Sequence, residues 1–370
     1  MIDDHAHPFA LEHAPLVLDE ISLDVDGPDA AARKRRLGPG RVFQELCLRT
    51  LGELLGLAKE VTDEEIAAAR DDAARDWGAY VRRLFDDADI TGMVLDFGIG
   101  AADPSTLATY RDLMGRPVWW LARVDPLVDE LIGRGAGAAE IVTALEEMTD
   151  SAAGAGAVGF KTIAAYRTGL RVDPDVDLRA AQASLDAAAS GELPVRRRAK
   201  ALRDLVTRTL LERAADHGLP VQFHTGFGDS EIRLAESNPL LLEELLRSPA
   251  GQAATIVLIH GSYPWHEELA YLASVRPNVH AELSLSNLFA PVTVGDRLLR
   301  ILELAPREKV LLGSDGHHLP ETHWFGCRTA RDALDEAGVR LRAAGAREAF
   351  VTAVRAAVLE DNARRVYGLG

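Results

Sequence analysis

The sequence contains little cysteine and no long hydrophobic run. Only two cysteines, Cys47 and Cys327, occur among 370 residues, too few for a disulfide framework and typical of a reducing compartment. No apolar run approaches the roughly 20 residues that a membrane-spanning helix requires. The first ten residues, MIDDHAHPFA, carry charge where a secretory signal peptide has an apolar core. We therefore expect a cytoplasmic protein that has no membrane partner.

Positive charge is also scarce. The formal net charge is −16 at pH 7, whereas nucleic acids and anionic membranes bind to basic surfaces. The composition therefore argues against nucleic acid as a partner, although a small anionic substrate can still bind to a local cation. Only five lysines accompany 36 arginines, so a lysine next to an apolar run, such as Lys161, is conspicuous.

Short apolar runs recur along the chain and alternate with longer helical patterns. Near-continuous apolar runs of this kind are typical of buried parallel strands, and eight of them alternating with helices predict a (β/α)₈ TIM barrel. We expect one α/β domain over residues 1–370. The eight predicted strands are Ile2–Asp4, Met93–Leu95, Val118–Leu121, Val158–Phe160, Val221–Phe223, Ile256–Ile259, Val279–Leu283 and Val310–Leu312.

The first two predicted strands are separated by about eighty residues, from Phe9 to Asp89. This stretch contains the segments RVFQELCLRTLGELLG and EEIAAARDDAARDWGAYVRRLFDDA. Apolar residues recur in both with a period near 3.6, which indicates amphipathic helices. The sequence therefore predicts a helical insertion, residues 9–89, within the barrel.

Polar residues follow several of these strands, and barrel enzymes carry their active sites at the carboxyl ends of the strands. Strand one is followed by His5 and His7. Side chains at i and i+2 of an extended segment point to one face, so both imidazoles can bind one metal ion.

Four further ionisable residues each stand directly after an apolar run. An unpaired ionisable group costs several kcal/mol when it is buried, so six of them meeting at one barrel mouth require mutual compensation. A divalent cation provides this most simply. The four residues are Lys161, His224, His260 and Asp315.

This pattern, with the motif HAHP at the start of the chain, resembles the amidohydrolase superfamily. The C-terminal segment DNARRVYGL resembles the last helix of the branch called amidohydrolase family 2. The segments GFKTIAAYRTGL, LIHGSYPWHEELAYLA and NVHAELSLSN are similar to a subgroup linked to glutamine-synthetase-like enzymes and to hydrolases of γ-glutamyl amides.

The resemblance implies that His5, His7, His224 and Asp315 bind the metal. Imidazoles and a carboxylate suit Zn²⁺, and Mn²⁺ or Fe²⁺ would also fit. Such a metal lowers the pKa of a bound water toward about 7. Asp315 would accept the proton of the attacking water and pass it to the leaving group. His260 would either bind a second metal or polarise the substrate carbonyl.

Lys161 separates a one-metal mechanism from a two-metal mechanism. In binuclear members of the superfamily a lysine at this place is carboxylated and bridges two metals, whereas family 2 members are commonly mononuclear. The resemblance to family 2 favours one metal, with Lys161 nearby as a catalytic residue or as a partner for a substrate carboxylate.

Further residues near the strand ends are candidates for substrate binding. Arg167 suits a two-point grip on a carboxylate, and Tyr166, Trp265 and His317 are placed to line a pocket. Glu282 on strand seven is predicted to orient a ligand histidine.

We expect a metal-dependent hydrolase that cleaves an amide C–N bond in a small molecule, and we expect the chain to form a homo-oligomer. The alternative is non-oxidative decarboxylation of an aromatic or unsaturated acid, which a flat aromatic pocket would favour. Aromatic residues form only 6% of the chain, so hydrolysis is the leading hypothesis. A third hypothesis, a non-catalytic scaffold, would predict missing metal positions, and none is missing.

Overall fold

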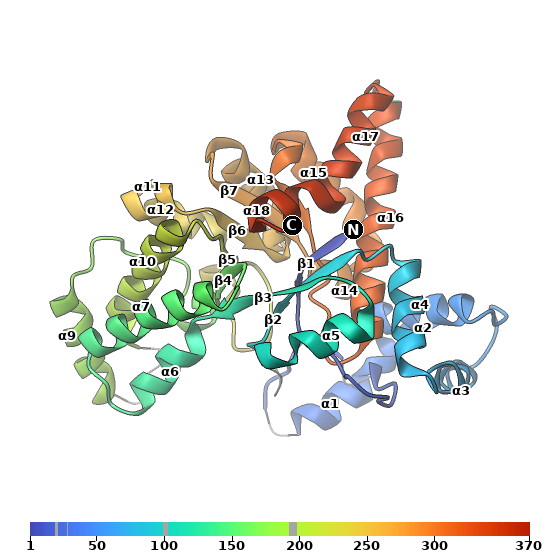
Figure 1. The fold of residues 1–370 in the computed structure, drawn as a ribbon, viewed down its shortest axis with the longest axis horizontal. Helices are drawn as coiled ribbons and strands as arrows, with labels where there is room; N and C mark the ends of the chain where they lie inside the picture. Colours follow the sequence, from blue (N-terminus) through green and yellow to red (C-terminus); the bar gives the residue numbers. More distant parts are fainter. Residues whose placement is uncertain (19–20, 28, 99–102, 192–197) are drawn as a thin grey trace.

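A computed structural model describes residues 1–18, 21–27, 29–98, 103–191 and 198–370. The chain forms one eight-stranded parallel sheet in the order β1 to β8, with helices between successive strands (Figure 1). This arrangement confirms the predicted (β/α)₈ barrel. The strands are β1 Ile2–Ala6, β2 Gly92–Asp96, β3 Val118–Arg123, β4 Gly159–Thr162, β5 Val221–His224, β6 Ile256–Ile259, β7 Val279–Leu283 and β8 Val310–Leu312.

The sheet closes on itself between β1 and β8, directly beyond the last residues of β8. The amide of Asp315 donates to the carbonyl of His5 at 2.9 Å, and the amide of His7 donates to the carbonyl of Gly316 at 2.8 Å. Both bonds lie at the carboxyl end of the barrel. The closure therefore holds Asp315 beside His5 and His7, although more than 300 residues separate Asp315 from the two histidines in the sequence.

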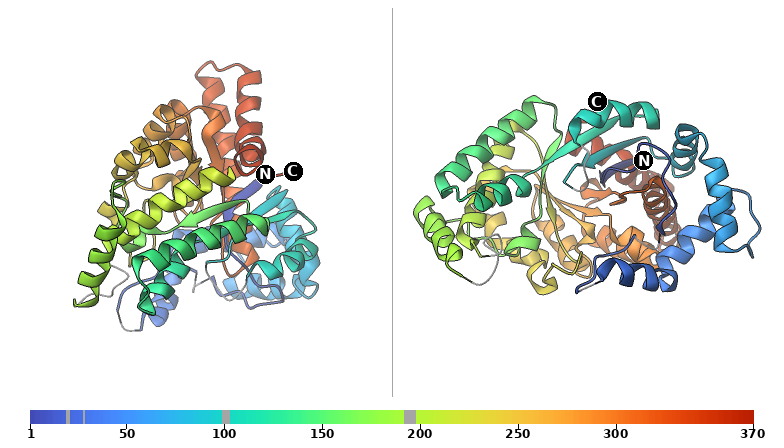
Figure 2. Two further views of the ribbon diagram at one scale, coloured as in Figure 1. Left: turned by 60° about the vertical axis from the view of Figure 1, so that its left-hand side comes forward. Right: turned by 90° about the horizontal axis from the view of Figure 1, so that it is seen from below.

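Helices surround the strands, as the view along the barrel shows (Figure 2). Short 3₁₀ turns lie between several of them, and a π-helical segment, Ala357–Asp361, joins α17 to α18. The helices after β2 are α5 Leu107–Met114, α6 Asp125–Gly133, α7 Ala138–Gly154, α8 Ala164–Arg167, α9 Leu178–Ala189, α10 Lys200–His217, α11 Glu243–Arg247, α12 Pro249–Ala253, α13 His266–Val275, α14 Ser286–Phe289, α15 Val294–Leu304, α16 Pro320–Ala343, α17 Glu348–Ala356 and α18 Asn362–Tyr367.

The predicted helical insertion lies between β1 and β2. It contains α1 Ala30–Leu37, α2 Val42–Leu54, α3 Asp63–Ala73 and α4 Trp77–Asp87. Thr62 begins α3 with a capping box, in which its hydroxyl accepts from the amide of Glu65 and the Glu65 carboxylate accepts from the amide of Thr62. The turn before α3 is thus fixed by local sequence.

A buried polar cluster fastens this insertion to α16. The Arg70 guanidinium of α3 donates to the Glu321 carboxylate at 2.7 Å, and the Tyr80 hydroxyl of α4 donates to the same oxygen at 2.8 Å. Arg70 and Glu321 have no exposed surface. We call Arg70, Tyr80 and Glu321 the fastening cluster.

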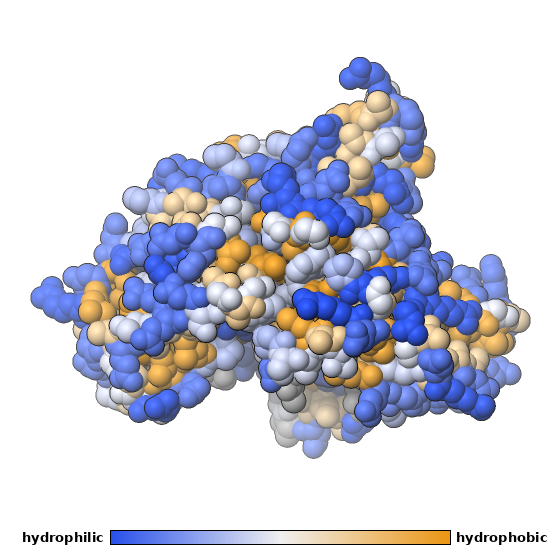
Figure 3. Space-filling view, in the orientation of Figure 1, coloured by the Kyte–Doolittle hydropathy of each residue, from blue (hydrophilic) through white to orange (hydrophobic). Residues whose placement is uncertain are grey.

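The surface seen in Figure 3 is mostly hydrophilic, with apolar residues scattered over it. Among the described residues, none of the helices combines the length and the apolar character needed to cross a bilayer.

Candidate metal centre

Three predicted ligands meet at the seam of the barrel. The Nε2 atoms of His5 and His7 lie 3.0 and 3.2 Å from Oδ1 of Asp315. All three residues are at most 7% exposed. The strand order and the closing hydrogen bonds of β1 therefore produce the cluster that the His-x-His motif and the end of β8 predicted.

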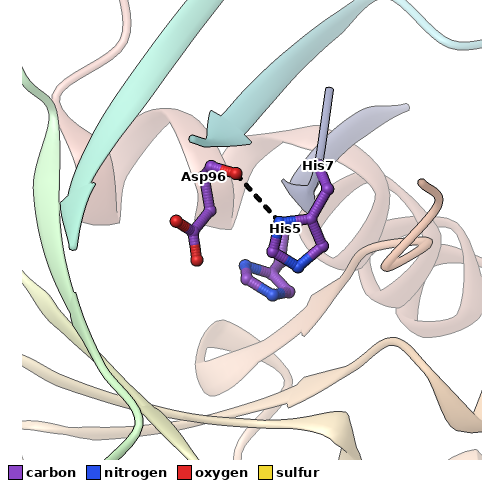
Figure 4. A group of neighbouring side chains, drawn as sticks. All are labelled: His5, His7 and Asp96. Carbon is purple, nitrogen blue, oxygen red and sulfur yellow. Dashed lines mark hydrogen bonds between the residues drawn. The ribbon is translucent and has the colours of Figure 1, made fainter. Parts of the chain in front are cut away.

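The hydrogen bonds of His7 show what this cluster requires. Its Nδ1 lies 2.9 Å from the carbonyl oxygen of Asp96 (Figure 4). A carbonyl can only accept, so Nδ1 carries the hydrogen and Nε2 presents a lone pair. That lone pair faces Oδ1 of Asp315, another acceptor. Two acceptors in contact repel each other unless a cation, either a metal ion or a proton, lies between them.

Unpartnered atoms lead to the same conclusion. Within the described part of the chain, both ring nitrogens of His5 and Oδ1 of Asp315 are buried without a hydrogen-bond partner. Buried polar atoms without partners are costly, and these are nitrogen and oxygen donors of the kind that bind divalent zinc, manganese or iron. The residues present fit a metal ion.

His260 and His224 stand beside this cluster. Ligand atoms of His5, His260 and Asp315 all lie within 4.8 Å of one another, and so do those of His5, His7 and Asp96. The His224 ring is 4.4 Å from that of His260. Its Nε2 lies 3.1 Å from the carbonyl of Phe227, which leaves Nδ1 to bind a metal. Of the two, His260 lies close enough to His5 and Asp315 to share a metal ion with them, whereas His224 adjoins the cluster through its contact with the His260 ring.

The backbone at two of these residues adopts a conformation that side chains disfavour. His260 has φ 69° and Asp315 has φ 54°. A left-handed conformation outside glycine costs of the order of 1 kcal/mol or more and recurs at functional sites. His260 directly follows β6 and Asp315 stands three residues after the end of β8, so these strained turns direct each side chain into the barrel mouth.

Burial favours the neutral form of three of these imidazoles. Burial is the largest cause that lowers the pKa of His5, to about 4, and burial also lowers the pKa of His224 and His260 well below the usual value. Burial opposes ionisation of Asp315, yet its pKa falls well below the usual value when His260 is charged and when His5 and His7 carry a hydrogen toward it; a bound metal ion takes the place of that positive charge. Neutral imidazoles and an ionised carboxylate are the forms that bind a metal.

Asp96 and Arg123 belong to this site and were missed from the sequence. The Arg123 guanidinium donates from Nε to Oδ2 of Asp96 at 3.0 Å, and Asp96 Oδ1 accepts from the amide of Gly98. Burial opposes ionisation of Asp96 most strongly, but Arg123, His7 and Lys161 together outweigh it and lower the pKa. Asp96 and Arg123 end β2 and β3, so the rule that located His224 and Asp315 also points to them.

Lys161 ends up in the same interior, 1% exposed. Burial lowers its pKa to about 8, against the attraction of Asp96. Its ammonium group forms no hydrogen bond or ion pair with any residue that the structure describes. The carboxylates of Asp96, Asp315 and Glu282 favour its cation from beyond direct contact, so the hydrogen atoms of its ammonium group remain available to an anionic ligand.

The cluster forms the floor of a cavity of about 620 Å³. The insertion supplies much of the mouth through residues between Val17 and Lys34. Apart from the histidines, the aromatic residues that line the cavity are Tyr166 and Phe289. The lining residues include His5, His7, Val17, Ile21, Ser22, Leu23, Asp24, Ala31, Lys34, Arg123, Lys161, Ile163, Tyr166, Arg167, His224, Gly228, Asp229, His260, Leu285, Phe289, Asp315, His317 and His318.

Three of the four residues predicted to bind substrate line this cavity: Tyr166, Arg167 and His317. The Arg167 guanidinium is paired with the Asp129 carboxylate at 2.8 Å, a partner that the sequence did not reveal. Trp265 instead lines a separate surface hollow beside His266, so its placement does not support a role in the main cavity.

Fold and site together define a (β/α)₈ barrel with a metal-binding centre at the carboxyl ends of its strands. The model of the amidohydrolase family, Amidohydro_2, matches residues 2–369. The chain therefore belongs to the amidohydrolase family, which confirms the resemblance noted in its motifs.

Individual proteins extend this comparison. A crystal structure of a presumed metal-dependent hydrolase from Lactobacillus casei ATCC 334 superposes with a TM-score of 0.84 at 26% identity, covering 99% of this chain and 94% of that one. A uronate isomerase from Thermotoga maritima shares the fold with a TM-score of 0.70 at 15% identity, over 99% and 94% of the two chains.

A curated relative is the protein fluG of Emericella nidulans, 36% identical over 203 residues. The match spans 51% of this chain and 23% of the relative. The chain thus corresponds to less than a quarter of the length of that protein.

Proposed function

We propose that the protein is a metal-dependent hydrolase that cleaves the amide C–N bond of a carboxylate-bearing small molecule, such as a γ-glutamyl amide. The observation that carries this proposal is the contact at the cavity floor, where the bare Nε2 of His7 faces Oδ1 of Asp315 at 3.2 Å. Membership in the amidohydrolase family supports it.

The metal ligands in this proposal are His5, His7, His224 and Asp315, and one zinc ion is the expected occupant. A divalent cation in such a site supplies Lewis acidity toward water and the substrate carbonyl. His260, beside the ligands, faces the reacting atoms. Metal content separates the two histidines: His224→Ala is expected to lose metal, whereas His260→Ala retains metal and loses activity.

Asp315 has the position and charge of a proton carrier. Its Oδ1 lies among the ligands, 3.0 Å from Nε2 of His5, and an ionised carboxylate at this place can accept a proton. It accepts a proton from the attacking water and returns that proton to the leaving nitrogen. The cavity floor is buried, so bulk water does not compete for this proton.

The substrate acid is assigned to the cations of the cavity wall. Lys161 makes no direct ion pair with a described residue, although nearby carboxylates attract it. Arg167 retains donors beyond those that pair with Asp129. The wall is largely aliphatic and polar rather than flat and aromatic. This lining favours an extended amide over the aromatic acid of a decarboxylase.

The test is a substrate panel with zinc-reconstituted protein. Release of glutamate from γ-glutamyl amides is measured beside carbon dioxide release from hydroxybenzoic acids and isomerisation of glucuronate. The proposal expects amide cleavage that Asp315→Asn abolishes and that Asp112→Asn, on the exposed face of α5, leaves intact. Decarboxylation or isomerisation without amide cleavage would overturn it.

A further inference from the structure

We propose that Ser284 is a positioning residue which, together with Glu282, makes Nε2 of His260 a hydrogen-bond acceptor in the reaction. A neutral His260 of this form accepts a proton or a hydrogen bond and cannot donate one to a substrate carbonyl. Only the kinetic test of this inference rests on the proposed function.

The geometry is a closed set of three hydrogen bonds. Ser284, the residue after β7, has its Oγ 2.8 Å from Nδ1 of His260 and donates to Oε2 of Glu282 at 2.8 Å. The same Oε2 accepts from the backbone amide of His260 at 3.0 Å. All three residues are at most 1% exposed, so water does not compete for these bonds.

The direction of each bond follows from the count of hydrogens. A serine hydroxyl has one hydrogen, and Ser284 directs it to Glu282. Its Oγ can then only accept from His260, so Nδ1 carries the imidazole hydrogen and Nε2 is bare. Glu282 Oε1 lacks a partner among the described residues, and a proton bound there would leave Oε2 free to accept both bonds.

His7 offers an independent parallel in the same site. The carbonyl of Asp96 fixes its hydrogen on Nδ1 and leaves Nε2 bare toward Asp315. His260 has Ser284 in the place of that carbonyl, and its ring lies within ligand distance of His5 and Asp315. His7 and His260 thus each have Nδ1 held by an outer partner, and each lies beside His5 and Asp315.

The turn that carries Ser284 is held in place by its surroundings. The next residue, Leu285, has φ 40°, a strained value for a leucine. Asn287 fixes this turn, because its side-chain amide donates to the carbonyls of Leu283 at 2.6 Å and Gly313 at 3.0 Å. A rigid support of this kind is what orients a functional side chain.

The decisive measurement is the tautomer of His260, which needs no substrate. Protein labelled with ¹⁵N-histidine is studied by NMR, metal-free and zinc-loaded, and the His260 signals are identified by their loss in His260→Gln. We expect hydrogen on Nδ1 in the wild type and in Ser284→Thr, and a mixture of tautomers in Ser284→Ala. Hydrogen on Nε2 in the wild type, or no change in Ser284→Ala, would overturn the inference.

Kinetics provide a second readout. Loss of a group that orients a site histidine typically costs about 10- to 100-fold. For a hydrolysed γ-glutamyl amide, we expect this loss in kcat for Ser284→Ala, with KM little changed, and recovery in Ser284→Thr. The control is Ser248→Ala, because Ser248 also donates and accepts through its hydroxyl but caps α12, ahead of β6.

These two readouts separate the inference from the proposed function. If no amide is hydrolysed, the NMR result still decides the tautomer. If amides are hydrolysed and Ser284→Ala retains full kcat with an unchanged tautomer, the inference fails alone.

Discussion

The metal centre and the fastening cluster are both buried and both charged, yet their contacts differ in kind. In the fastening cluster, the Arg70 cation and the Tyr80 hydroxyl donate to one oxygen of Glu321. In the metal centre, the lone pairs of His7 and Asp315 face each other. The first arrangement stabilises the fold by itself, whereas the second requires a bound cation.

The strongest expected effect concerns Asp315. Asp315→Asn removes both a ligand and a proton carrier, so activity should fall by at least about 10³-fold. The same change relieves the contact between two acceptors, so the metal-free protein should unfold at the same denaturant concentration as the wild type or at a higher one. Denaturant unfolding of both proteins in chelator measures this. A marked loss of metal-free stability would show that the centre supports the fold as the fastening cluster does.

The next effect concerns Glu321. Glu321→Ala removes the buried partner of the Arg70 guanidinium and leaves it only the more exposed Asp71 carboxylate at 3.2 Å; breaking a buried ion pair in this way costs about 3–5 kcal/mol. The free energy of unfolding should fall accordingly, while activity per folded molecule stays near the wild-type level. Arg75→Ala is the control, because Arg75 is an 81% exposed arginine of the same insertion and its loss should change neither quantity.

The fastening cluster can also be replaced as a unit. The double variant Arg70→Met with Glu321→Leu removes both charges, so it should be more stable than Glu321→Ala. The free energies of unfolding of Arg70→Met, Glu321→Leu and the double variant are compared. If the loss in the double variant equals the sum of the two single losses, the cluster stabilises the fold through more than its ion pair.

The smallest effect is the pH dependence of the metal-free protein. The folded-state pKa of His5 is lowered to about 4 from the ordinary 6.5, mainly by burial. Between these values the unfolded chain binds the proton that the folded chain excludes. Stability is therefore fully present above about pH 6.5 and is lost as the pH falls toward 4.

Denaturant unfolding across this range measures that loss, and His5→Asn should reduce it. An identical pH dependence in the variant would show that His5 is protonated in the folded state, contrary to the lone-pair contacts of the centre.

The sequence predicted most of the fold and site because apolar runs mark the strands and the polar residue that follows each run marks the site, and both are local patterns. The apolar runs near Val94, Phe223 and Leu311 are strands in the structure, and His224 and Asp315 follow two of them. Asp96 and Arg123 follow the same rule and could have been found with it. Their mutual ion pair, however, depends on two neighbouring strands.

Other features depend on packing that no local pattern contains. The partner of Arg167 is Asp129, one strand and one helix away in sequence. Lys34 reaches the cavity only because the insertion folds back over the mouth. Trp265 faces a different hollow because the turn after His260 directs it there.

The most direct test of the account is the metal content per chain after zinc reconstitution and removal of excess metal. We predict one equivalent in the wild type and in Lys161→Ala, and almost none in Asp315→Ala. Two equivalents in the wild type, falling to one in Lys161→Ala, would contradict the single-metal centre. A wild-type chain that binds no zinc, manganese or iron would contradict the metal centre itself.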